Sequence, residues 1–228
     1  MTNQFRPPAV PLVTVDPFFS IWSCADELHQ DKTRHWTLVP HELVGLIRVD
    51  DRVLRFLGST NDGPAWRNAK QPSGMHQTEI LVKPTRSIYR FEDAGVELTV
   101  TFATPLLPDD LDLLSRPFSY VHMAVRSTDG KPHSVQLYLE ASAGIACADP
   151  GENVVWEEAE VPGGWTTLRA GTWQQNYLSH RGDLTTIDWG YVHLMSGPDA
   201  QHRIADASEM RADFVARGAV DGATVVPS

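Results

Sequence analysis

The sequence predicts a mainly β protein, an antiparallel β-sandwich that carries a short helix near its C-terminal end. Sixteen prolines and sixteen glycines interrupt the 228-residue chain at short intervals. The segments between them mostly alternate apolar and polar side chains, which is the period of a strand. The apolar spacing that is typical of a helix is clear at only one place. This pattern predicts about ten or more strands of about 5–6 residues each, and it leaves their order open.

The predicted strands, in chain order, cover residues 43–49, 53–57, 78–82, 87–92, 96–103, 120–127, 134–141, 153–157, 165–170 and 185–195. Asp50 and Asp51 separate the first two strands as a tight turn. Residues 96–103 show the clearest alternation. Residues 120–127 and 134–141, with a polar turn segment between them, predict an antiparallel hairpin.

The one clear helix is predicted near the end of the chain. Asp206 followed by Glu209 matches a capping box. Met210 and Phe214 then share one face of the helix, and Gly218 is placed where a left-handed residue ends it.

The charge balance excludes several classes of partner. The chain has 29 acidic and 19 basic side chains and a net charge of −10. Such a protein repels phosphate backbones and anionic lipid surfaces, so we predict neither a nucleic-acid partner nor a membrane. The sequence shows no apolar run of about 18 residues and no signal peptide at its start, which predicts a cytoplasmic protein as the sequence stands.

Common catalytic and cofactor signatures are missing from the sequence. It contains no G-x-S-x-G elbow, no S-x-x-K pair, no phosphate-binding loop and no dinucleotide fingerprint. The nine histidines form no H-x-H or H-x-x-x-H pair that would direct two imidazoles at one metal ion. Cys24 and Cys147 lie far apart and are expected to be two unpaired, buried thiols. We therefore predict no cofactor and no metal site.

A first candidate site is the segment Arg34-His35-Trp36, which places a cation, an imidazole and an indole next to one another. This combination suits a polar ligand pocket that uses hydrogen bonds and stacking. The alternative is packing, because a tryptophan beside an arginine often forms an amphipathic seam between a loop and a sheet.

A second candidate is acidic. Asp109, Asp110 and Asp112 precede Arg116 within a few positions. Close carboxylates can act as general acid and base or ligate a hard cation. The alternative is local structure, in which Asp109 or Asp110 caps a short helical turn at 109–114 and Asp112 pairs with Arg116 at i, i+4. The spacing favours the structural alternative.

A third candidate, Asp188-Trp189-Gly190-Tyr191, lies in the last predicted strand. A glycine between two large aromatic residues indicates a bulge or a close approach of two backbones. Asp188 is either a buried functional carboxylate or a turn residue. The seven tryptophans of the chain would form a stacking platform for sugar rings if exposed and sandwich core if buried.

Six segments, taken in order, resemble the glutaminase A type family of large fungal and bacterial glutaminases. They are residues 8–23, 34–37, 45–50, 83–86, 102–117 and 187–191. The resemblance covers essentially the whole chain, and several long motifs in the right order make it more specific than any single short pattern. One departure is Leu38, where the family pattern leads us to expect a glycine.

The resemblance implies a domain arrangement. Members of the family are several times longer and place a helical-barrel domain after a β-rich N-terminal region, which is similar to the super-sandwich that accompanies six-hairpin helical-barrel glycosidases. This chain then corresponds to the N-terminal region alone. Residues 1–60 are expected to form a segment that packs on the sandwich, and residues 61–228 the glutaminase A N-terminal-like domain, with its C-terminal end left open.

The resemblance also implies a function. The full-length family hydrolyses L-glutamine to L-glutamate and ammonia, with its active site mainly in the barrel, and its members are often secreted. This chain is therefore expected to be an accessory region that is not catalytic alone and has the barrel domain as its partner, with a small-molecule amide or a glycan as substrate. The alternatives are a carbohydrate-binding or glycosidase-associated β-sandwich and a purely structural domain.

If a site for amide hydrolysis does lie in this chain, it needs a base and an electrophilic donor for the oxyanion. The candidate bases are Asp109, Asp110, Asp112 and Asp188. The candidate binding groups are Arg34, His35, Trp36 and Arg116.

Overall fold

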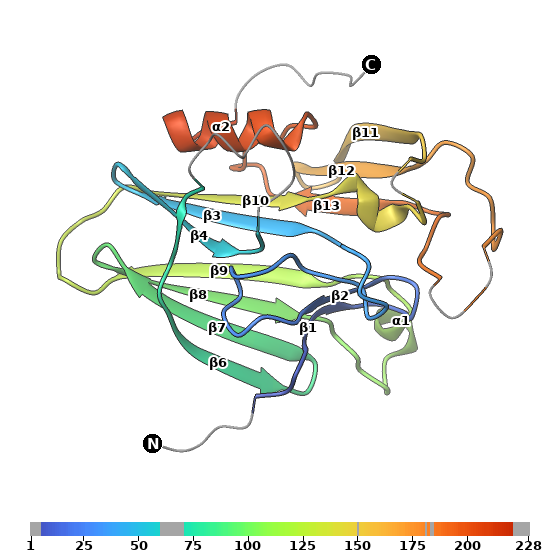
Figure 1. Cartoon of the computed structure of the whole chain (residues 1–228), viewed down its shortest axis with the longest axis horizontal. Helices are drawn as coiled ribbons and strands as arrows, with labels where there is room; N and C mark the ends of the chain where they lie inside the picture. The colour runs from blue at the N-terminus through green and yellow to red at the C-terminus, as the bar shows by residue number, and fades with distance from the viewer. Residues whose placement is uncertain (1–5, 60–70, 150, 181, 183–184, 221–228) are drawn as a thin grey trace.

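Two β-sheets packed face to face form the body of the molecule and appear as two layers in Figure 1. The structure is a computed structural model that describes residues 6–59, 71–149, 151–180, 182 and 185–220. The first sheet contains β3 (Leu43–Val49), β4 (Arg52–Leu57), β5 (Ser73–Gly74) and β10 (Val135–Ala141), in the order β10-β3-β4-β5. The second contains β6 (Gln77–Lys83), β7 (Arg86–Asp93), β8 (Val96–Ala103) and β9 (Tyr120–Ser127), in chain order. Apart from the short β4–β5 pair, neighbouring strands are antiparallel, which confirms the predicted antiparallel sandwich.

Side chains from alternate strand positions fill the space between the two sheets. In β8, Val96, Leu98, Val100 and Phe102 are buried, and the residues between them are partly exposed. This is the period of two that the sequence predicted for residues 96–103. Ile47 of β3 reaches the same core from the other sheet. Each fully buried side chain of this size contributes about 1.5–3 kcal/mol to folding.

Helix α2 (Ala207–Arg217) covers the outer face of the first sheet (Figure 1). Phe214 packs on Tyr138 of β10 with 5.3 Å between ring centroids, in one apolar cluster with Val44 and Leu46 of β3. Strand β3 is therefore buried on both faces, which explains why its sequence is almost continuously apolar.

The ends of α2 are those that the sequence predicted. The Asp206 carboxylate accepts hydrogen bonds from the amides of Ser208 and Glu209 at the helix start. Gly218 ends the helix with a φ of 73°, a left-handed conformation that glycine adopts without a steric cost.

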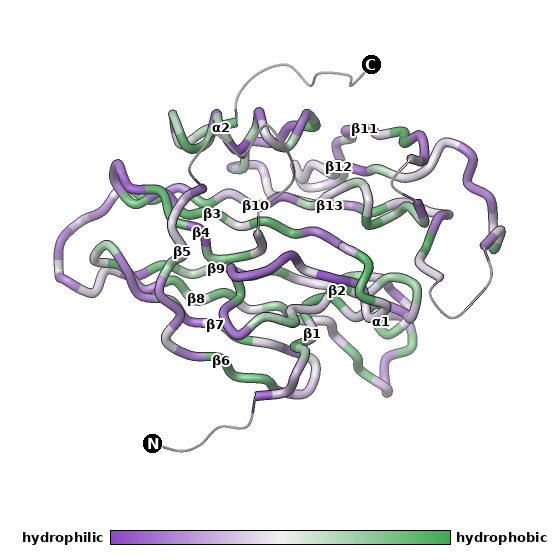
Figure 2. The backbone as a smooth tube through the Cα atoms, in the orientation of Figure 1, coloured by the Kyte–Doolittle hydropathy of each residue, from purple (hydrophilic) through white to green (hydrophobic). Residues whose placement is uncertain are grey.

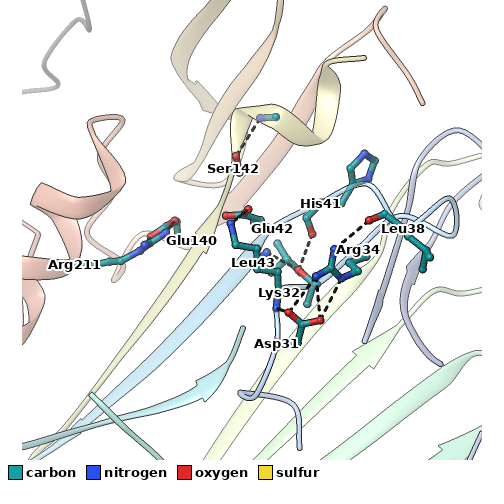
Figure 3. Close-up of polar contacts among 12 residues, drawn as sticks. Asp31, Lys32, Arg34, Leu38, His41, Glu42, Leu43, Glu140, Ser142 and Arg211 are labelled. Carbon is teal, nitrogen blue, oxygen red and sulfur yellow. Dashed lines mark hydrogen bonds and ion pairs between the residues drawn. The ribbon is translucent and has the colours of Figure 1, made fainter. Parts of the chain in front are cut away.

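A buried ion pair joins α2 to β10. The Arg211 guanidinium donates two hydrogen bonds to the Glu140 carboxylate, at 2.8 and 2.6 Å, and Figure 3 shows the two side chains facing each other. The Tyr138 hydroxyl donates a third bond to the same carboxylate, at 2.6 Å. The charge of Glu140 is therefore met from two elements although both partners of the ion pair are almost completely buried.

Smaller elements surround the sandwich. A third sheet contains β11 (Val154–Val161), β12 (Trp165–Thr172) and β13 (Val192–Ser196), and a fourth contains β1 (Val10–Thr14) and β2 (Ser20–Ser23). The helix α1 (Leu111–Leu114) lies within the predicted helical stretch 109–114, and a 3-10 turn covers Ala143–Ala146. Strands β1 and β2 were not predicted from the sequence. Pro11 interrupts the apolar pattern of β1, and β2 has only four residues.

The predicted hairpin between residues 120–127 and 134–141 is wrong. Strand β9 pairs only with β8, and β10 pairs with β3 in the other sheet. The loop between them crosses from one layer to the other. It is strongly hydrophilic (Figure 2), and His133 attaches it to the β3–β4 turn through Asp50. Local sequence indicates two adjacent strands and a turn, but not which neighbour each strand chooses.

The predicted strand 185–195 is wrong in its first half, because only Val192–Ser196 is a strand. Gly190 adopts a φ of 75°, which turns the chain just before β13. A Cβ atom on Gly171 would lie 2.4 Å from the carbonyl oxygen of Gly190. The close approach therefore requires a glycine at position 171, whereas a Cβ atom on Gly190 would meet open space and the glycine there is explained by its positive φ.

Two further expectations concern the cysteines and the domain boundary. Both cysteines are free, and Cys147 is buried as predicted, but Cys24 is exposed because it directly follows the end of β2. The boundary predicted at residues 60–61 lies outside the described residues. On either side of it, β3 and β4 share a sheet with β10.

Candidate functional site

The loop between β1 and β2 is the centre of the candidate site. The Asp16 carboxylate accepts hydrogen bonds from the amides of Phe18 and Phe19, at 2.7 and 3.0 Å, which folds residues 16–19 into a turn. This turn presents the Pro17 carbonyl oxygen to one neighbouring segment and the Phe18 ring to another. The loop thereby joins parts of the chain that are distant in sequence.

His35 and Trp36 lie against one side of this loop. His35 Nε2 and Trp36 Nε1 both donate to the Pro17 carbonyl oxygen, at 2.9 and 2.6 Å. His35 Nδ1 accepts from the Thr37 amide, so the hydrogen bonds assign a neutral imidazole that carries its proton on Nε2. Trp36 keeps about half of its surface exposed.

Asp188 and Trp189 lie on the other side of the loop. The ring of Phe18 packs edge to face on Trp189 with 5.4 Å between centroids, and Trp189 packs in the same way on Tyr177, also at 5.4 Å. The Ile187 amide donates to the Phe18 carbonyl oxygen at 3.3 Å. The structure thus places the first and third sequence candidates around one turn, with a row of aromatic rings between them.

Burial keeps the histidines of this region neutral. His35 and His41 are fully buried, and their rings lie 4.9 Å apart. Burial lowers the pKa of His35, and burial together with the nearby His35 lowers the pKa of His41 to about 4. A proton on either ring would place a charge in a buried position, so both are neutral structural groups near neutral pH, and His41 Nδ1 donates to the Ser20 carbonyl oxygen at 3.1 Å.

Arg34 is occupied by its own hairpin. Its guanidinium donates to both oxygens of Asp31 and, at 3.2 Å, to the Leu38 carbonyl oxygen, as Figure 3 shows. Its backbone pairs with Trp22 of β2. Leu38 has a φ of 72°, a left-handed conformation that disfavours side chains, and this is the physical reason why a glycine is expected there.

Asp188 is the most deeply buried carboxylate of the candidate site, with 1% of its side chain exposed. Its Oδ2 accepts from Ser179 Oγ at 2.8 Å and lies 2.5 Å from His180 Nδ1. Its Oδ1 has no hydrogen-bond partner among the described residues. The Thr172 hydroxyl donates to its carbonyl oxygen at 2.6 Å, which fixes the backbone at the same point.

The contact with Asp188 favours the protonated form of His180. The hydrogen bond to Asp188 raises the pKa of His180, and its half-exposed ring directs Nε2 towards Asp149, 3.8 Å away. Ser179 contacts the Nδ1 side of the ring, where Asp188 also lies, so Nε2 is not positioned to deprotonate that hydroxyl. The group is a carboxylate–imidazole pair and not a serine triad.

The acidic candidates lie on a separate, exposed segment. Asp110 Oδ1 accepts from the Leu113 amide at 2.9 Å and caps α1, as the structural alternative predicted. Asp109, Asp112 and Arg116 are exposed. Asp112 and Arg116 are both described residues, and the ion pair predicted between them is absent from the structure. Within the described part of the chain, no hydrogen bond or ion pair joins this segment to Asp188.

A cleft of about 790 Å³ lies between α2, β10 and the third sheet. Its walls are mainly apolar and include Met123, Leu137, Leu168 and Leu194. None of the eight residues predicted as site candidates lines it. Among the described residues no group of three or more His, Cys, Asp or Glu side chains is arranged to hold a metal ion. No described helix has both the length and the apolar content that a membrane span requires.

Three members of the site, Phe18, Tyr177 and His180, were not predicted from the sequence. Phe18 lies inside one of the motifs that carried the family resemblance, but nothing marked it as a contact of Trp189. His180 precedes Asp188 by eight residues in a polar stretch, and no local spacing connects the two. The turn that brings them together is a tertiary feature.

The fold and the loop site define a two-layer β-sandwich domain with one helix on its outer face. The chain belongs to the family described as Domain of unknown function (DUF5127), which matches residues 85–225. A second family, Domain of unknown function (DUF4964), matches residues 1–62.

Two curated proteins are similar to most of this chain. It is 28% identical over 220 residues to Glutaminase A of Aspergillus oryzae. That alignment covers 89% of this chain and 30% of the relative. It is 20% identical over 234 residues to a probable glutaminase of Arthroderma benhamiae. That alignment covers 95% of this chain and 26% of the relative. The chain spans less than a third of the length of either relative. These relatives confirm the predicted resemblance to the glutaminase A type family.

Proposed function

We propose that this chain is the β-sandwich accessory region of a glutaminase-related amidohydrolase. It packs against a helical-barrel domain of the kind that the family resemblance implies, and it does not hydrolyse glutamine by itself. The observation that carries the proposal is a set of exposed, mainly aliphatic side chains on residues 104–120, called the aliphatic face below, in a chain that matches less than a third of each glutaminase relative.

The aliphatic face is formed by one segment that returns to its starting point. The Thr104 and Ser119 hydroxyls meet at 2.6 Å and close its base. Between and beside them, large apolar side chains face solvent: Leu106, Leu107, Leu111, Leu114, Phe118 and Tyr120. An apolar patch of this kind is typical of a surface that another protein surface covers.

Helix α1 shows how little of this segment packs on the sandwich. All four of its residues are described, and none is buried; Leu111 is 72% exposed. A helix of one turn is not stable by propensity alone. Here the Asp110 cap holds it in place, which preserves a defined shape on an unpacked apolar surface.

The geometry of the candidate site supports the non-catalytic part of the proposal. Hydrolysis of a primary amide requires a base with access to water and donors directed at the developing oxyanion. Asp188 is buried beneath Ser179 and His180, and Arg34 is bound to Asp31 and Leu38. These side chains therefore hold the loops in place, and His180 remains half-exposed.

Ammonia release from L-glutamine by the purified chain, with a thermal melt of the same sample, tests the proposal. We expect a cooperative melt and no ammonia above the buffer background. Glutamine turnover by the folded chain would overturn the non-catalytic assignment. Asp188→Asn and His180→Gln would then show whether the Asp188–His180 pair is responsible.

A further inference from the structure

We propose that the loop 172–180 is a binding platform for neutral oligosaccharides, with Trp173 and Tyr177 as its stacking residues. This inference is independent of the accessory role, because it concerns a different surface and a different class of ligand. Four features of the loop carry it: the exposure of its aromatic rings, its amide side chains, its rigid backbone and the support behind Tyr177.

The two rings are displayed to solvent. Trp173 is 71% exposed and Tyr177 is 73% exposed. Large aromatic side chains gain free energy when their faces leave water, so a surface that holds two of them outward gains from a ligand with a flat apolar face. The C–H face of a pyranose ring is such a ligand.

Amide side chains stand beside the rings. Asn176 Nδ2 donates to Gln174 Oε1 at 2.8 Å, and both side chains are exposed. This contact orients the two amides and leaves the Gln174 amino group and the Asn176 carbonyl group without a partner in that pair. One donor and one acceptor are what a sugar hydroxyl requires.

The loop is rigid before any ligand arrives. Gln175 Nε2 donates to the carbonyl oxygens of Thr172 and Gly190, at 2.9 and 3.0 Å, and Gln175 Oε1 accepts from the Gly190 amide at 2.6 Å. Gln175 and Leu178 adopt left-handed φ values of 48° and 50°. Such conformations are unfavourable for residues with side chains and persist where surrounding contacts determine them. A prebuilt surface loses less conformational entropy on binding.

The support behind Tyr177 comes from the candidate site. Tyr177 packs edge to face on Trp189, which packs on Phe18 of the β1–β2 loop. His180 lies three residues further along, and its Nδ1 contacts the Asp188 carboxylate, which fixes the end of the loop. The contacts of Tyr177 with Trp189, and of Trp189 with Phe18, therefore fix the position of the Tyr177 ring.

The chemistry of the loop distinguishes its ligand from a protein partner. The aliphatic face on residues 104–120 consists mainly of leucines, which suit a dry protein interface. The loop 172–180 pairs aromatic rings with amides, which suits a ligand that is apolar on its face and polar around its edge. The net charge of −10 disfavours polyanions, so the ligand is a neutral oligosaccharide.

Titration of the whole 228-residue chain with cellohexaose, chitohexaose and mannohexaose tests the proposal, read out by calorimetry and tryptophan fluorescence. We expect at least one to bind with a dissociation constant on the order of 0.1–1 mM, which is typical of an open surface site with few contacts. Trp173→Ala and Tyr177→Ala should each weaken that binding about tenfold, and Tyr177→Phe should retain it. Trp173→Ala and Tyr177→Phe should melt as the parent chain does, whereas Tyr177→Ala loses the contact with Trp189, so a thermal melt of each variant accompanies the titration.

Trp165→Ala is the matched control. Trp165 is also an exposed tryptophan, at 45%, but it lies at the start of β12 and outside the loop. We expect it to leave binding unchanged. The proposal is overturned if none of the three oligosaccharides binds, or if Trp165→Ala weakens binding as much as Trp173→Ala does.

Discussion

His133 shows how one residue sets the path of the chain between the two sheets. Its Nδ1 lies 2.9 Å from Asp50 Oδ2 and its Nε2 lies 3.1 Å from Asp129 Oδ1. Both nitrogens can donate only when the ring is protonated. The two carboxylates, Asp50 first, accordingly raise the pKa of His133. Lys131 approaches Asp129 at 3.9 Å and shares that carboxylate.

This geometry predicts a pH-dependent clamp. Because the pKa of His133 is higher in the folded state, the clamp stabilises fully below the ordinary histidine pKa of about 6.5 and is lost as pH rises through the raised value. His133→Gln should therefore lower the melting temperature at pH 5.5 and have a smaller effect at pH 9. Melts of both proteins across this range measure the difference. A difference that does not change with pH would contradict the clamp.

Leu38 and Gly190 show what single residues revealed in advance. Both positions stood out in the sequence, one as a departure from the family pattern and one as a glycine between aromatic rings. Both have a positive φ in the structure, of 72° and 75°. Local backbone demands of this kind can be read from residue type, because only a few residues adopt such conformations easily.

At the scale of elements, α2 depends on a buried ion pair for its attachment to β10. Arg211 and Glu140 have side chains that are 3% and 6% exposed. Removing one partner of a buried pair leaves the other charged without compensation, which costs about 3–5 kcal/mol. Arg211→Ala should therefore lower the free energy of unfolding by about this amount, as measured by urea denaturation.

Arg126→Ala is the control for this prediction. Arg126 forms the same two-bonded contact, with both oxygens of Glu97, but on the exposed face of β9. Solvent screens such a pair, so its loss should be far less destabilising. Equal effects of the two substitutions would show that burial of the Arg211 pair is not what matters.

The elements also mark the limit of pattern reasoning. Alternation predicted β8 and β9 at their observed bounds, since each is exposed to a different environment on its two faces. The hairpin of β9 with β10 failed because the choice of neighbour depends on the whole sheet. The strand predicted at residues 185–191 was wrong for a related reason, since this segment contacts the β1–β2 loop and not a neighbouring strand.

At the scale of the whole molecule, the aliphatic face on residues 104–120 predicts association. In the absence of a covering domain, the purified chain should self-associate as its concentration rises, because association removes exposed leucines from water. Sedimentation velocity measures this directly. Leu107→Ser with Leu111→Ser should shift the chain towards monomer.

Val154→Ser is the matched control, since Val154 is an exposed aliphatic residue at the start of β11, in a different part of the molecule. It should leave the association unchanged. A chain that stays monomeric at every concentration, or an equal response to the control, would remove the support for a covered face.

The sequence by itself determined the mainly β class, the C-terminal helix with its cap and end, a short helical turn capped by Asp109 or Asp110, and the family resemblance. Each follows from short-range periodicity, from hydrogen bonds between near neighbours or from motifs read in order. Tertiary structure alone decided that β9 and β10 belong to opposite sheets, that β3 is covered on both faces, and that His35, Trp36 and Asp188 meet around the β1–β2 loop. The physical reason is that these contacts join residues far apart along the chain, and their energy exists only once the sheets have packed.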